Sequence, residues 1–475
     1  MVSEHFLDTP LLYDGKMINE FIPQKYNRLV KVLEETNWKP EFENLEEKLD
    51  DVLDNPVGYT ESLEQLVARH YGKHNKILIL LDDNTRPNEH TKLLLPLLLP
   101  RLLDYGITKE DIHILFACGT HRAPTPAEQK GILGSEIWTE YHDRLLVHDC
   151  DKGCIDLGIQ SSMGTPIIIN EHVITADLVI PITDSELHYF AGVAGTIKEL
   201  IPGVAARRTV NKNHVRLFDP KLGFKTACRL GNVDGNPVIT DIKEMVNKIT
   251  KKVPIFGIDA IFGLHSREIV YLNAGDLVKL HEAAARRIVA LRTVEINSPA
   301  DIVIVSAKQL GINLYQTGKA IHTAWNAVKR GGQGKIIVLA ACRDGVGSAS
   351  YLQSMDQCKN KSLDQALEFV LAHYCTEETF RIGNQKPVDL IRILQSIGET
   401  NIHMITEMDP ELLKRTFRIN PIRKAPDESV STVLTQVLAD LVEWGKREKE
   451  GAPPSIYVIP DPGVLVVQKH QSIFL

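Results

Sequence analysis

The chain has 475 residues, of which 43% are hydrophobic and 24% are charged, and its formal net charge is −7. One hydrophobic core rarely supports this length, so we expect two or three domains. The composition is that of an ordinary globular protein, and the mild negative charge argues against a nucleic-acid-binding surface.

The sequence predicts neither a signal peptide nor a membrane span. Residues 1–16 carry acids and have no apolar core, and the apolar run at residues 93–103 is short and interrupted by prolines and Arg101. The seven cysteines are scattered; Cys150 and Cys154 lie close, but no second Cys or His pair has zinc-ligand spacing. We therefore expect a cytoplasmic protein with no membrane or nucleic-acid partner.

Short apolar runs predict buried strands, and the amphipathic stretches between them predict helices. The predicted strands are residues 76–81, 113–117, 177–182, 301–306, 335–340, 401–406 and 455–459. The clearest predicted helices are residues 276–291, 362–373 and 429–448. Strands that alternate with helices favour the α/β class with mainly parallel sheets. We therefore predict two α/β domains with the active site in the cleft between them.

Two turn-rich segments predict domain boundaries. Residues 297–300 (NSPA) precede a fresh strand–helix series, and residues 451–454 (GAPP) precede the last strand. We predict an N-terminal α/β domain of residues 1–297, which residues 455–475 rejoin. Residues 298–454 would form a C-terminal α/β domain that closes over the substrate.

Polar residues follow four of the predicted strands. They are Asp82, Asp83, Thr85 and Arg86, then His121, then Asp184 and His188, and finally Lys308, Tyr315, Gln316 and Lys319. Open α/β sheets bind ligands beyond the carboxyl ends of their strands. We therefore expect these side chains to collect at one rim.

Standard phosphate-binding loops are missing from the sequence. No G-x-G-x-x-G follows a strand, and the glycines at 331–334 precede a strand, which predicts a turn. A second glycine cluster, residues 192–203, holds Lys198 between Gly195 and Gly203. By itself this segment predicts a tight turn with a surface lysine.

Three histidines, His121, His188 and His214, adjoin distinct predicted elements. A single histidine is most often structural. Two imidazoles that face one substrate suit proton transfer, because their pKa lies near neutral pH. A third could hold a metal through a neutral ring nitrogen, and imidazole suits nickel as well as zinc.

The order of these motifs resembles the nickel-pincer lactate racemase family over nearly the whole chain. The matching pieces are Asp83-x-Thr-Arg-Pro, residues 119–122 (GTHR), residues 188–192 (HYFAG), Lys198 with Pro202 and Gly203, Asn213-His214, Tyr315-Gln316 with Lys319, residues 343–345 (RDG) and residues 458–461 (VIPD). Each piece is weak alone, but their shared order is specific.

The resemblance implies a racemase or epimerase of 2-hydroxy acids with a nickel pincer nucleotide (nickel pyridine-3,5-bisthiocarboxylic acid mononucleotide). Lys198 matches the covalent tether, and His214 matches the nickel ligand. Asp83 and Gly195 are expected beside the cofactor, and Asp83 could also hold Arg86 or the pocket lysine. In this family the C2 hydride passes to the cofactor and returns to either face.

The resemblance also implies the remaining site residues and the partners. His121 and His188 match the two histidines that exchange the substrate hydroxyl proton. Arg86, Tyr315, Gln316 and Lys319 match positions that line the substrate pocket, where a guanidinium suits a carboxylate. The expected partners are a small 2-hydroxy acid and cofactor-maturation enzymes; the oligomeric state is left open.

Two residues beside the tether depart from the family pattern. Ile197 stands where the family often has arginine, and Glu199 stands where serine is usual. These changes alter the charge near the cofactor and favour a substrate longer or more polar than lactate, such as a sugar acid or a hydroxy diacid.

Three other functions compete with this interpretation. A mononuclear metal hydrolase would need His121, His188, His214 and Asp83 to converge on one ion. A nicotinamide-dependent dehydrogenase lacks its glycine fingerprint here. An inactive cofactor-binding homologue would keep the tether without turnover, although both acid/base histidines are retained.

Overall fold

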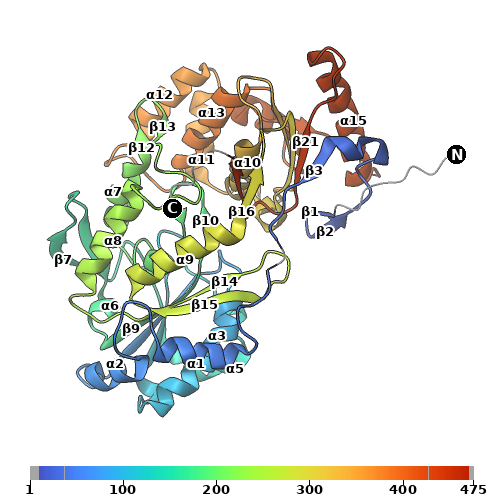
Figure 1. The fold of residues 1–475 in the computed structure, drawn as a ribbon. Helices are drawn as coiled ribbons and strands as arrows, with labels where there is room; N and C mark the ends of the chain where they lie inside the picture. Colours follow the sequence, from blue (N-terminus) through green and yellow to red (C-terminus); the bar gives the residue numbers. More distant parts are fainter. Residues whose placement is uncertain (1–9, 37, 426, 470–475) are drawn as a thin grey trace. The chain divides into compact units, whose positions relative to one another are not determined.

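The computed structural model describes residues 10–36, 38–425 and 427–469 and divides into two compact units (Figure 1). Unit 1 is built from Met1–Thr36, Phe218–Thr226 and Arg292–Phe474, and unit 2 from Asn37–Leu217 and Ala227–Leu291. Each unit contains a six-stranded sheet, and most strand pairs in both sheets are parallel. The predicted class, α/β with mainly parallel sheets, is therefore confirmed.

The sheet of unit 2 has the strand order β15-β14-β9-β4-β5-β6. These strands are β4 (Ile77–Leu81), β5 (Ile112–Phe116), β6 (Leu145–Val147), β9 (Leu178–Asp184), β14 (Gly257–Phe262) and β15 (Ile269–Gly275). Only β15 runs antiparallel to its neighbour. All five residues of β4 are buried, as expected for a central strand covered on both faces.

Helices cover both faces of this sheet. Ile77, Ile79 and Leu81 share one apolar cluster with residues of α1 (Leu45–Asp54), α2 (Leu63–His70) and α3 (Glu89–Asp104). On the other face, Ile261 and Val270 pack against α9 (Leu277–Arg292). In Figure 1, α1 and α9 accordingly lie on opposite sides of β14 and β15. Alternate side chains of each strand therefore serve two separate cores.

The sheet of unit 1 is parallel throughout, with the order β20-β19-β18-β17-β21-β3. Its strands are β3 (Val30–Val32), β17 (Ile302–Ser306), β18 (Lys335–Leu339), β19 (Ile402–Ile405), β20 (Asn420–Ile422) and β21 (Ile456–Ile459). α15 (Val430–Glu448) packs on one face. α10 (Leu314–Ala327) contacts β17, β18 and α13 (Gln385–Ile397).

All of the strands and helices named from the sequence occur, within about two residues at each end. The predicted helices correspond to α9, α12 (Leu363–Tyr374) and α15. Gly331 and Gly332 have φ of 68° and 78° just before β18, which is the predicted turn. The apolar run at residues 93–103 lies within α3, and no helix in the described part of the chain is long and apolar enough to cross a membrane.

Residues 455–469 differ from our expectation that residues 455–475 rejoin the N-terminal domain, and residues 470–475 lie outside the described part of the chain. β21 pairs with β17, and β22 (Leu465–Gln468) pairs with β16 (Thr293–Ile296), both within unit 1. The N-terminal segment also joins unit 1, because β3 extends this sheet beyond β21. The reason is burial: the inward residues of β21 complete the same core as those of β17.

Candidate active site

Three neighbouring strands of unit 2 deliver the predicted polar residues to one edge. β4 lies between β9 and β5, and Leu81 aligns with both Ile182 and Phe116. The strands are parallel, so the segments that follow them all start at the carboxyl edge. These segments carry Asp82, Asp83, Arg86, His121, Asp184 and His188, as the sequence predicted.

Asp83 and His121 form a hydrogen-bonded pair at this edge. His121 Nδ1 lies 2.7 Å from Asp83 Oδ2, while Asp83 Oδ1 accepts from the Thr85 amide at 2.8 Å. Burial raises the pKa of Asp83, but the hydrogen bond and charge of His121 and the bonds from Thr85 outweigh burial, so the pKa is lowered. An ionised Asp83 requires the Nδ1 proton on His121 and leaves Nε2 of the neutral ring as an acceptor.

The sequence did not predict this pairing. It placed Asp83 beside the cofactor, where its carboxylate could hold Arg86 or the pocket lysine. The side chain of Asp83 is only 3% exposed, whereas that of His121 is 43% exposed. A sheltered carboxylate thus orients an imidazole that remains accessible, the arrangement in which an acid/base histidine works.

His188 is held by a short hairpin of β10 (Leu187–His188) and β11 (Gly192–Val193). The Ala191 amide donates to His188 Nδ1 at 3.2 Å, so the proton of the neutral ring lies on Nε2. The hairpin needs a glycine at 192, where φ is 81° and a Cβ would lie 2.1 Å from the Asn232 carbonyl oxygen. Hydrogen bonds at Nδ1 therefore orient both imidazole rings.

His214 ends α7 (Arg207–His214), and Lys198 lies in the 3-10 turn η4 (Thr196–Glu199). His214 is 6% exposed, and burial followed by the charge of Lys198 lowers its pKa to about 3. The ring of Phe190 lies 5.6 Å from that of His214 and 4.5 Å from that of His188. Unit 2 thus gathers the predicted tether, metal ligand and one acid/base histidine, and His214 is neutral at physiological pH.

Backbone contacts fix the segment that carries Lys198. The Gly203 amide donates to the Lys198 carbonyl, and the Gly119 amide donates to the Gly203 carbonyl, each at 2.8 Å. Gly195 has φ of 88°, and a Cβ there would lie 2.7 Å from the Asp184 carbonyl oxygen. Gly195 is thus required for the close approach of this segment to the end of β9.

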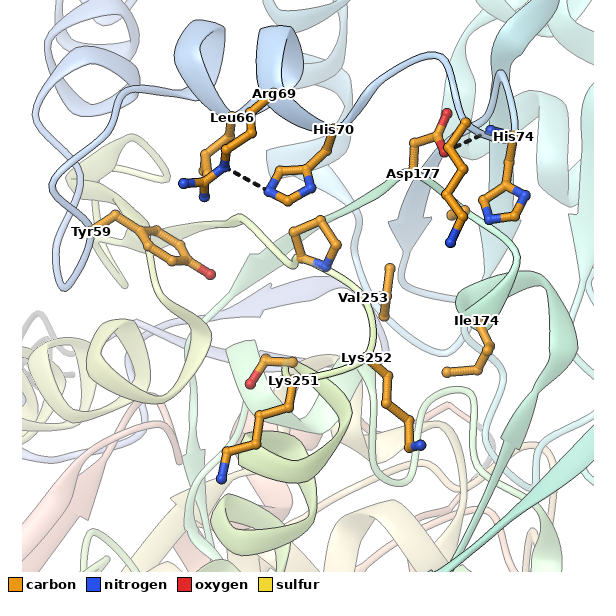
Figure 2. Close-up of a pocket in the computed structure, with 14 residues that line it drawn as sticks. Tyr59, Leu66, Arg69, His70, His74, Ile174, Asp177, Lys251, Lys252 and Val253 are labelled. Atoms are coloured by element: carbon orange, nitrogen blue, oxygen red, sulfur yellow. Dashed lines mark hydrogen bonds between the residues drawn. The ribbon is translucent and has the colours of Figure 1, made fainter.

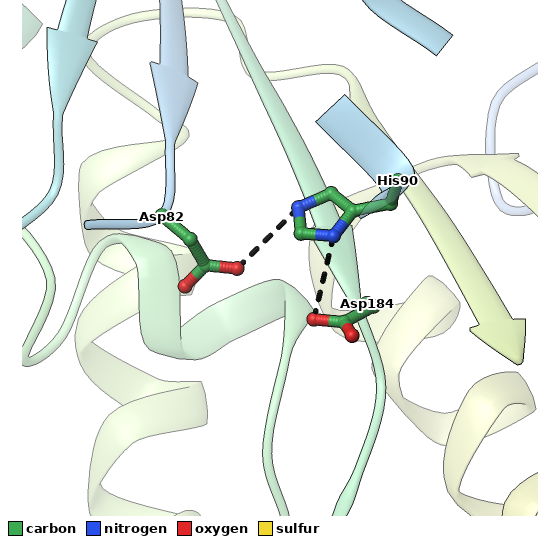
Figure 3. A group of neighbouring side chains, drawn as sticks. All are labelled: Asp82, His90 and Asp184. Carbon is green, nitrogen blue, oxygen red and sulfur yellow. Dashed lines mark ion pairs between the residues drawn. The ribbon is translucent and has the colours of Figure 1, made fainter. Parts of the chain in front are cut away.

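Arg86 lies near several acidic side chains. Two of them, Asp82 and Asp184, are shown in Figure 3 on either side of His90. Burial lowers the pKa of Arg86, but four carboxylates outweigh burial and raise it: Asp82, Glu186, Asp83 and Asp184. His90 is fully buried at the start of α3. Its Nε2 lies 3.4 Å from Asp82 Oδ2, and its Nδ1 lies 3.6 Å from Asp184 Oδ1. Burial lowers the pKa of His90, although the charges of Asp82 and Glu186 oppose this. Acidic side chains of the protein itself therefore stabilise the charged form of Arg86.

The pKa values of Glu199 and Asp184 are raised in this group. Glu199 is 6% exposed, and burial followed by the charge of Asp82 raises its pKa well above the usual value. Burial, followed by the charges of Glu186 and Asp82, does the same for Asp184. Glu199, the residue that departs from the family pattern, thus adds a buried carboxyl group with a raised pKa beside the tether. Sequence reasoning missed His90 and Glu186, which follow no motif.

The remaining predicted residues lie together at the start of α10 in unit 1. The Asn313 side chain caps this helix by accepting from the Gln316 amide at 2.9 Å. Tyr315 and Lys319 are four residues apart and share one face. Gln385 Nε2 donates to the Tyr315 hydroxyl at 3.2 Å, and Lys386 Nζ lies 5.1 Å from the Tyr315 ring centroid. No motif pointed to Lys386.

The histidines do not form a metal cluster of their own. In the part of the chain that the structure describes, three potential metal ligands converge in two groups, Asp82 with His90 and Asp184, and Asp149 with Cys150 and Asp151. Neither group contains His121, His188 or His214. The convergence that a mononuclear hydrolase requires of these histidines is therefore not seen.

A hollow of about 360 Å³ lies at the opposite edge of the same sheet (Figure 2). Its lining comes from segments that precede β4, β9 and β14, including His74, Asp177 and Lys252. The Asp177 carboxylate shapes it by accepting from the amides of Gly72, His74 and Lys76. None of the predicted site residues lines this hollow, so the amino edge of the sheet is separate from the candidate site.

Comparison with known families covers both units. The model of the lactate racemase N-terminal domain matches residues 13–224, and that of the lactate racemase C-terminal domain matches residues 296–436. Together these matches include every site residue predicted from the sequence.

Two curated relatives are lactate racemases. The chain is 31% identical to the protein of Lactiplantibacillus plantarum over 426 residues, covering 89% of this chain and 91% of the relative. It is 30% identical to the protein of Thermoanaerobacterium thermosaccharolyticum over 311 residues, covering 65% and 68%.

Two solved structures share the fold of this chain. The lactate racemase apoprotein of T. thermosaccharolyticum superposes with a TM-score of 0.77 and 25% identity, covering 98% of this chain and all of that one. A crystal structure of a Thermotoga maritima protein shares the fold at a TM-score of 0.62 and 18% identity, covering 92% of this chain.

Proposed function

We propose, from the premise that this chain belongs to the lactate racemase family, that it inverts C2 of a 2-hydroxy acid by reversible hydride transfer to a tethered nickel pincer nucleotide. The observation that carries the proposal is the pair of histidines in unit 2, His121 and His188, each of which is oriented by a hydrogen bond at Nδ1, to Asp83 and to the Ala191 amide respectively. A reversible inversion needs one proton acceptor and one proton donor at the substrate hydroxyl.

The side chains of unit 2 fit the cofactor that we propose. His214 supplies a buried neutral imidazole, the form that binds a metal, and Lys198 is close enough for its charge to lower the pKa of His214. Among the described residues, His214 belongs to no group of three potential ligands, so the other donors would come from the cofactor. When bound, the cofactor supplies the hydride acceptor, which no side chain offers.

The two histidines divide the proton transfer. His121 takes the hydroxyl proton at Nε2 as the carbonyl of the keto acid forms, and ionised Asp83 stabilises the resulting imidazolium through the 2.7 Å hydrogen bond. His188, in its imidazolium form, returns a proton from Nε2 when the hydroxyl re-forms on the opposite face, and it is left as the neutral ring. For the other enantiomer the roles are exchanged.

The substrate carboxylate is assigned to Arg86 and Lys319, with Tyr315 and Gln316 beside it. Acidic side chains of the protein already stabilise the charge of Arg86, so we assign the larger share of the binding to Lys319. Ile197 and Glu199 favour a substrate longer or more polar than lactate. We also propose a cytoplasmic enzyme that depends on separate maturation enzymes for its cofactor.

The proposal is tested on protein produced together with the maturation enzymes. A panel of 2-hydroxy acids in deuterated water should show inversion with the C2 hydrogen largely retained, because it travels as hydride. Complete deuterium incorporation at C2 would instead establish proton abstraction and exclude the hydride mechanism.

The division of labour is tested with His121→Ala and His188→Ala, each supplied with one enantiomer at a time. Each variant should convert one enantiomer to bound keto acid but should not release the opposite enantiomer as product. A variant that racemises both at a rate near wild type would show that its histidine is structural. Loaded wild-type protein that turns over no 2-hydroxy acid would identify an inactive cofactor-binding homologue.

A further inference from the structure

The turn that carries Lys198 contains a backbone conformation that its sequence disfavours. Thr196, two residues before Lys198, has φ of 46°. Among the described non-glycine residues with a positive φ, it is the only one with a β-branched side chain. A β-branched residue in this region is a genuine outlier, because its Cβ crowds the backbone. Such a conformation persists only where the surrounding structure holds it, and these conformations cluster at functional sites.

A side-chain hydroxyl of β9 holds this turn. The Thr196 amide donates to Thr183 Oγ1 at 3.1 Å, and both residues are buried. Thr183 lies one residue before the carboxyl end of β9, which is an interior strand of the sheet. The turn η4 also contacts β14 and α8 (Pro237–Ile249). The hydrogen bond therefore joins the residue with the disfavoured backbone directly to the sheet.

Two acceptors on β14 orient the Thr183 hydroxyl. Thr183 Oγ1 donates to Asp259 Oδ1 at 2.5 Å, and the Ile258 carbonyl oxygen lies 3.3 Å from the same hydroxyl. Ser185 Oγ donates to the other oxygen of this carboxylate, Asp259 Oδ2, at 2.8 Å. A hydroxyl has one proton and two lone pairs. In either protonation form of Asp259, Thr183 Oγ1 therefore keeps a lone pair for the Thr196 amide.

We infer that Thr183 is a positioning residue for the cofactor tether, because its hydroxyl fixes the turn from which the Lys198 side chain starts. The inference rests on the proposed function, which makes Lys198 the tether. Lysine has a flexible four-carbon stem. A fixed starting point for this stem limits where the cofactor lies relative to His214, which ends a separate helix. A displacement of about 1 Å at a reacting centre can lower a rate by about a hundredfold.

The hydrogen bond itself is tested on the full chain produced without the maturation enzymes. Thr183→Val keeps the shape of the side chain and removes the hydroxyl, whereas Thr183→Ser keeps the hydroxyl. Amide hydrogen exchange of the peptide that contains Thr196 should become about ten- to a hundredfold faster in Thr183→Val, because a buried amide loses its acceptor. The exchange rate in Thr183→Ser should stay near that of the wild type.

The effect on the tether is tested on protein produced together with the maturation enzymes. Activity is divided by the Lys198 adduct content from intact mass. In Thr183→Val, kcat per adduct should fall by about ten- to a hundredfold, with KM within about threefold of wild type. Nickel should also pass to a chelator faster, since the cofactor is held less precisely against His214. Thr183→Ser should restore both properties.

Ser185→Ala is the matched control. It also removes a hydroxyl donor from Asp259, but it leaves the bond between Thr183 and the Thr196 amide in place. This variant should lower thermal stability. It should leave Thr196 exchange, nickel release and kcat per adduct within about threefold of wild type. If Thr183→Val does not fold, Thr183→Ala and Thr183→Ser make the same comparison, because they differ only in the hydroxyl oxygen.

Other results contradict the inference in distinguishable ways. Wild-type values of kcat per adduct and of nickel release in Thr183→Val would show that the hydroxyl does not position the tether. Equal changes in Thr183→Val and Ser185→Ala would assign the effect to Asp259 and refute the inference. A wild type that carries the adduct but turns over no 2-hydroxy acid would refute the proposed function alone, because exchange and nickel release report the positioning without turnover.

Discussion

Replacement of Asp83 by asparagine tests the Asp83–His121 pair directly. The substitution keeps the size of the side chain and removes its charge. In the wild type the pKa of Asp83 is lowered, so the carboxylate is ionised throughout the neutral range. Its contribution to stability is present above the ordinary carboxyl pKa of about 3.9 and is lost only as pH falls through the lowered value. Asp83 therefore does not titrate between pH 6 and pH 8, and kcat measured anywhere in this range reports the ionised carboxylate of the wild type.

The expected loss follows from two effects on His121. A hydrogen bond to a charged group is worth about 1.5–3 kcal/mol, which corresponds to about ten- to 150-fold in rate. Asparagine can also turn its NH₂ group toward Nδ1, which places the ring proton on Nε2 and removes the base. Such a tautomer change in a Ser-His-Asp triad costs about 10⁴-fold. We expect kcat to fall by about 10²- to 10⁴-fold.

The assay measures racemisation in both directions on variant enzyme whose nickel and adduct content match wild type. Asp177→Asn is the control, because Asp177 is also buried but accepts backbone amides at the opposite edge of the same sheet. The control should lower thermal stability and leave kcat within about threefold of wild type. If Asp83→Asn keeps a kcat near wild type, or if both variants lose activity equally, the carboxylate does not orient His121 for catalysis.

Three further predictions concern the cofactor site and stability. Lys198→Ala should show the unmodified mass and no racemase activity, whereas an active wild type without an adduct on its Lys198 peptide would contradict the tether. His214→Ala should fold and lose nickel, measured by metal analysis; stoichiometric nickel with unchanged spectra would refute the ligand. Asp259 is fully buried, and burial, despite hydrogen bonds from Thr183 and Ser185, raises its pKa to about 7. Wild type should therefore lose up to about 4 kcal/mol of stability as pH rises from 4 to 7, and Asp259→Asn should not. Equal pH dependence of the two thermal midpoints would contradict this.

The sequence alone determined the class of fold and the order of its parts. Apolar runs such as residues 76–81 and 301–306 are short, rich in β-branched or aliphatic residues and bounded by turn residues. Runs of this length favour buried strands over helices. Because parallel strands share a carboxyl edge, it was also predictable that Asp83, His121 and His188 would start from one rim of the sheet. Motif order then indicated the family.

Only the tertiary structure decided which segments and side chains meet. Periodicity identifies a strand but not its neighbour, so the pairing of β21 with β17 in unit 1 could not be read from residues 455–459. The same limit applies to side chains: Asp83 holds His121 across 38 residues, and Lys386 meets Tyr315 across more than 70. Burial then set the charges, lowering the pKa of His214 to about 3 and that of Lys386 to about 7. Desolvation depends on what surrounds a group in three dimensions, which no local pattern encodes.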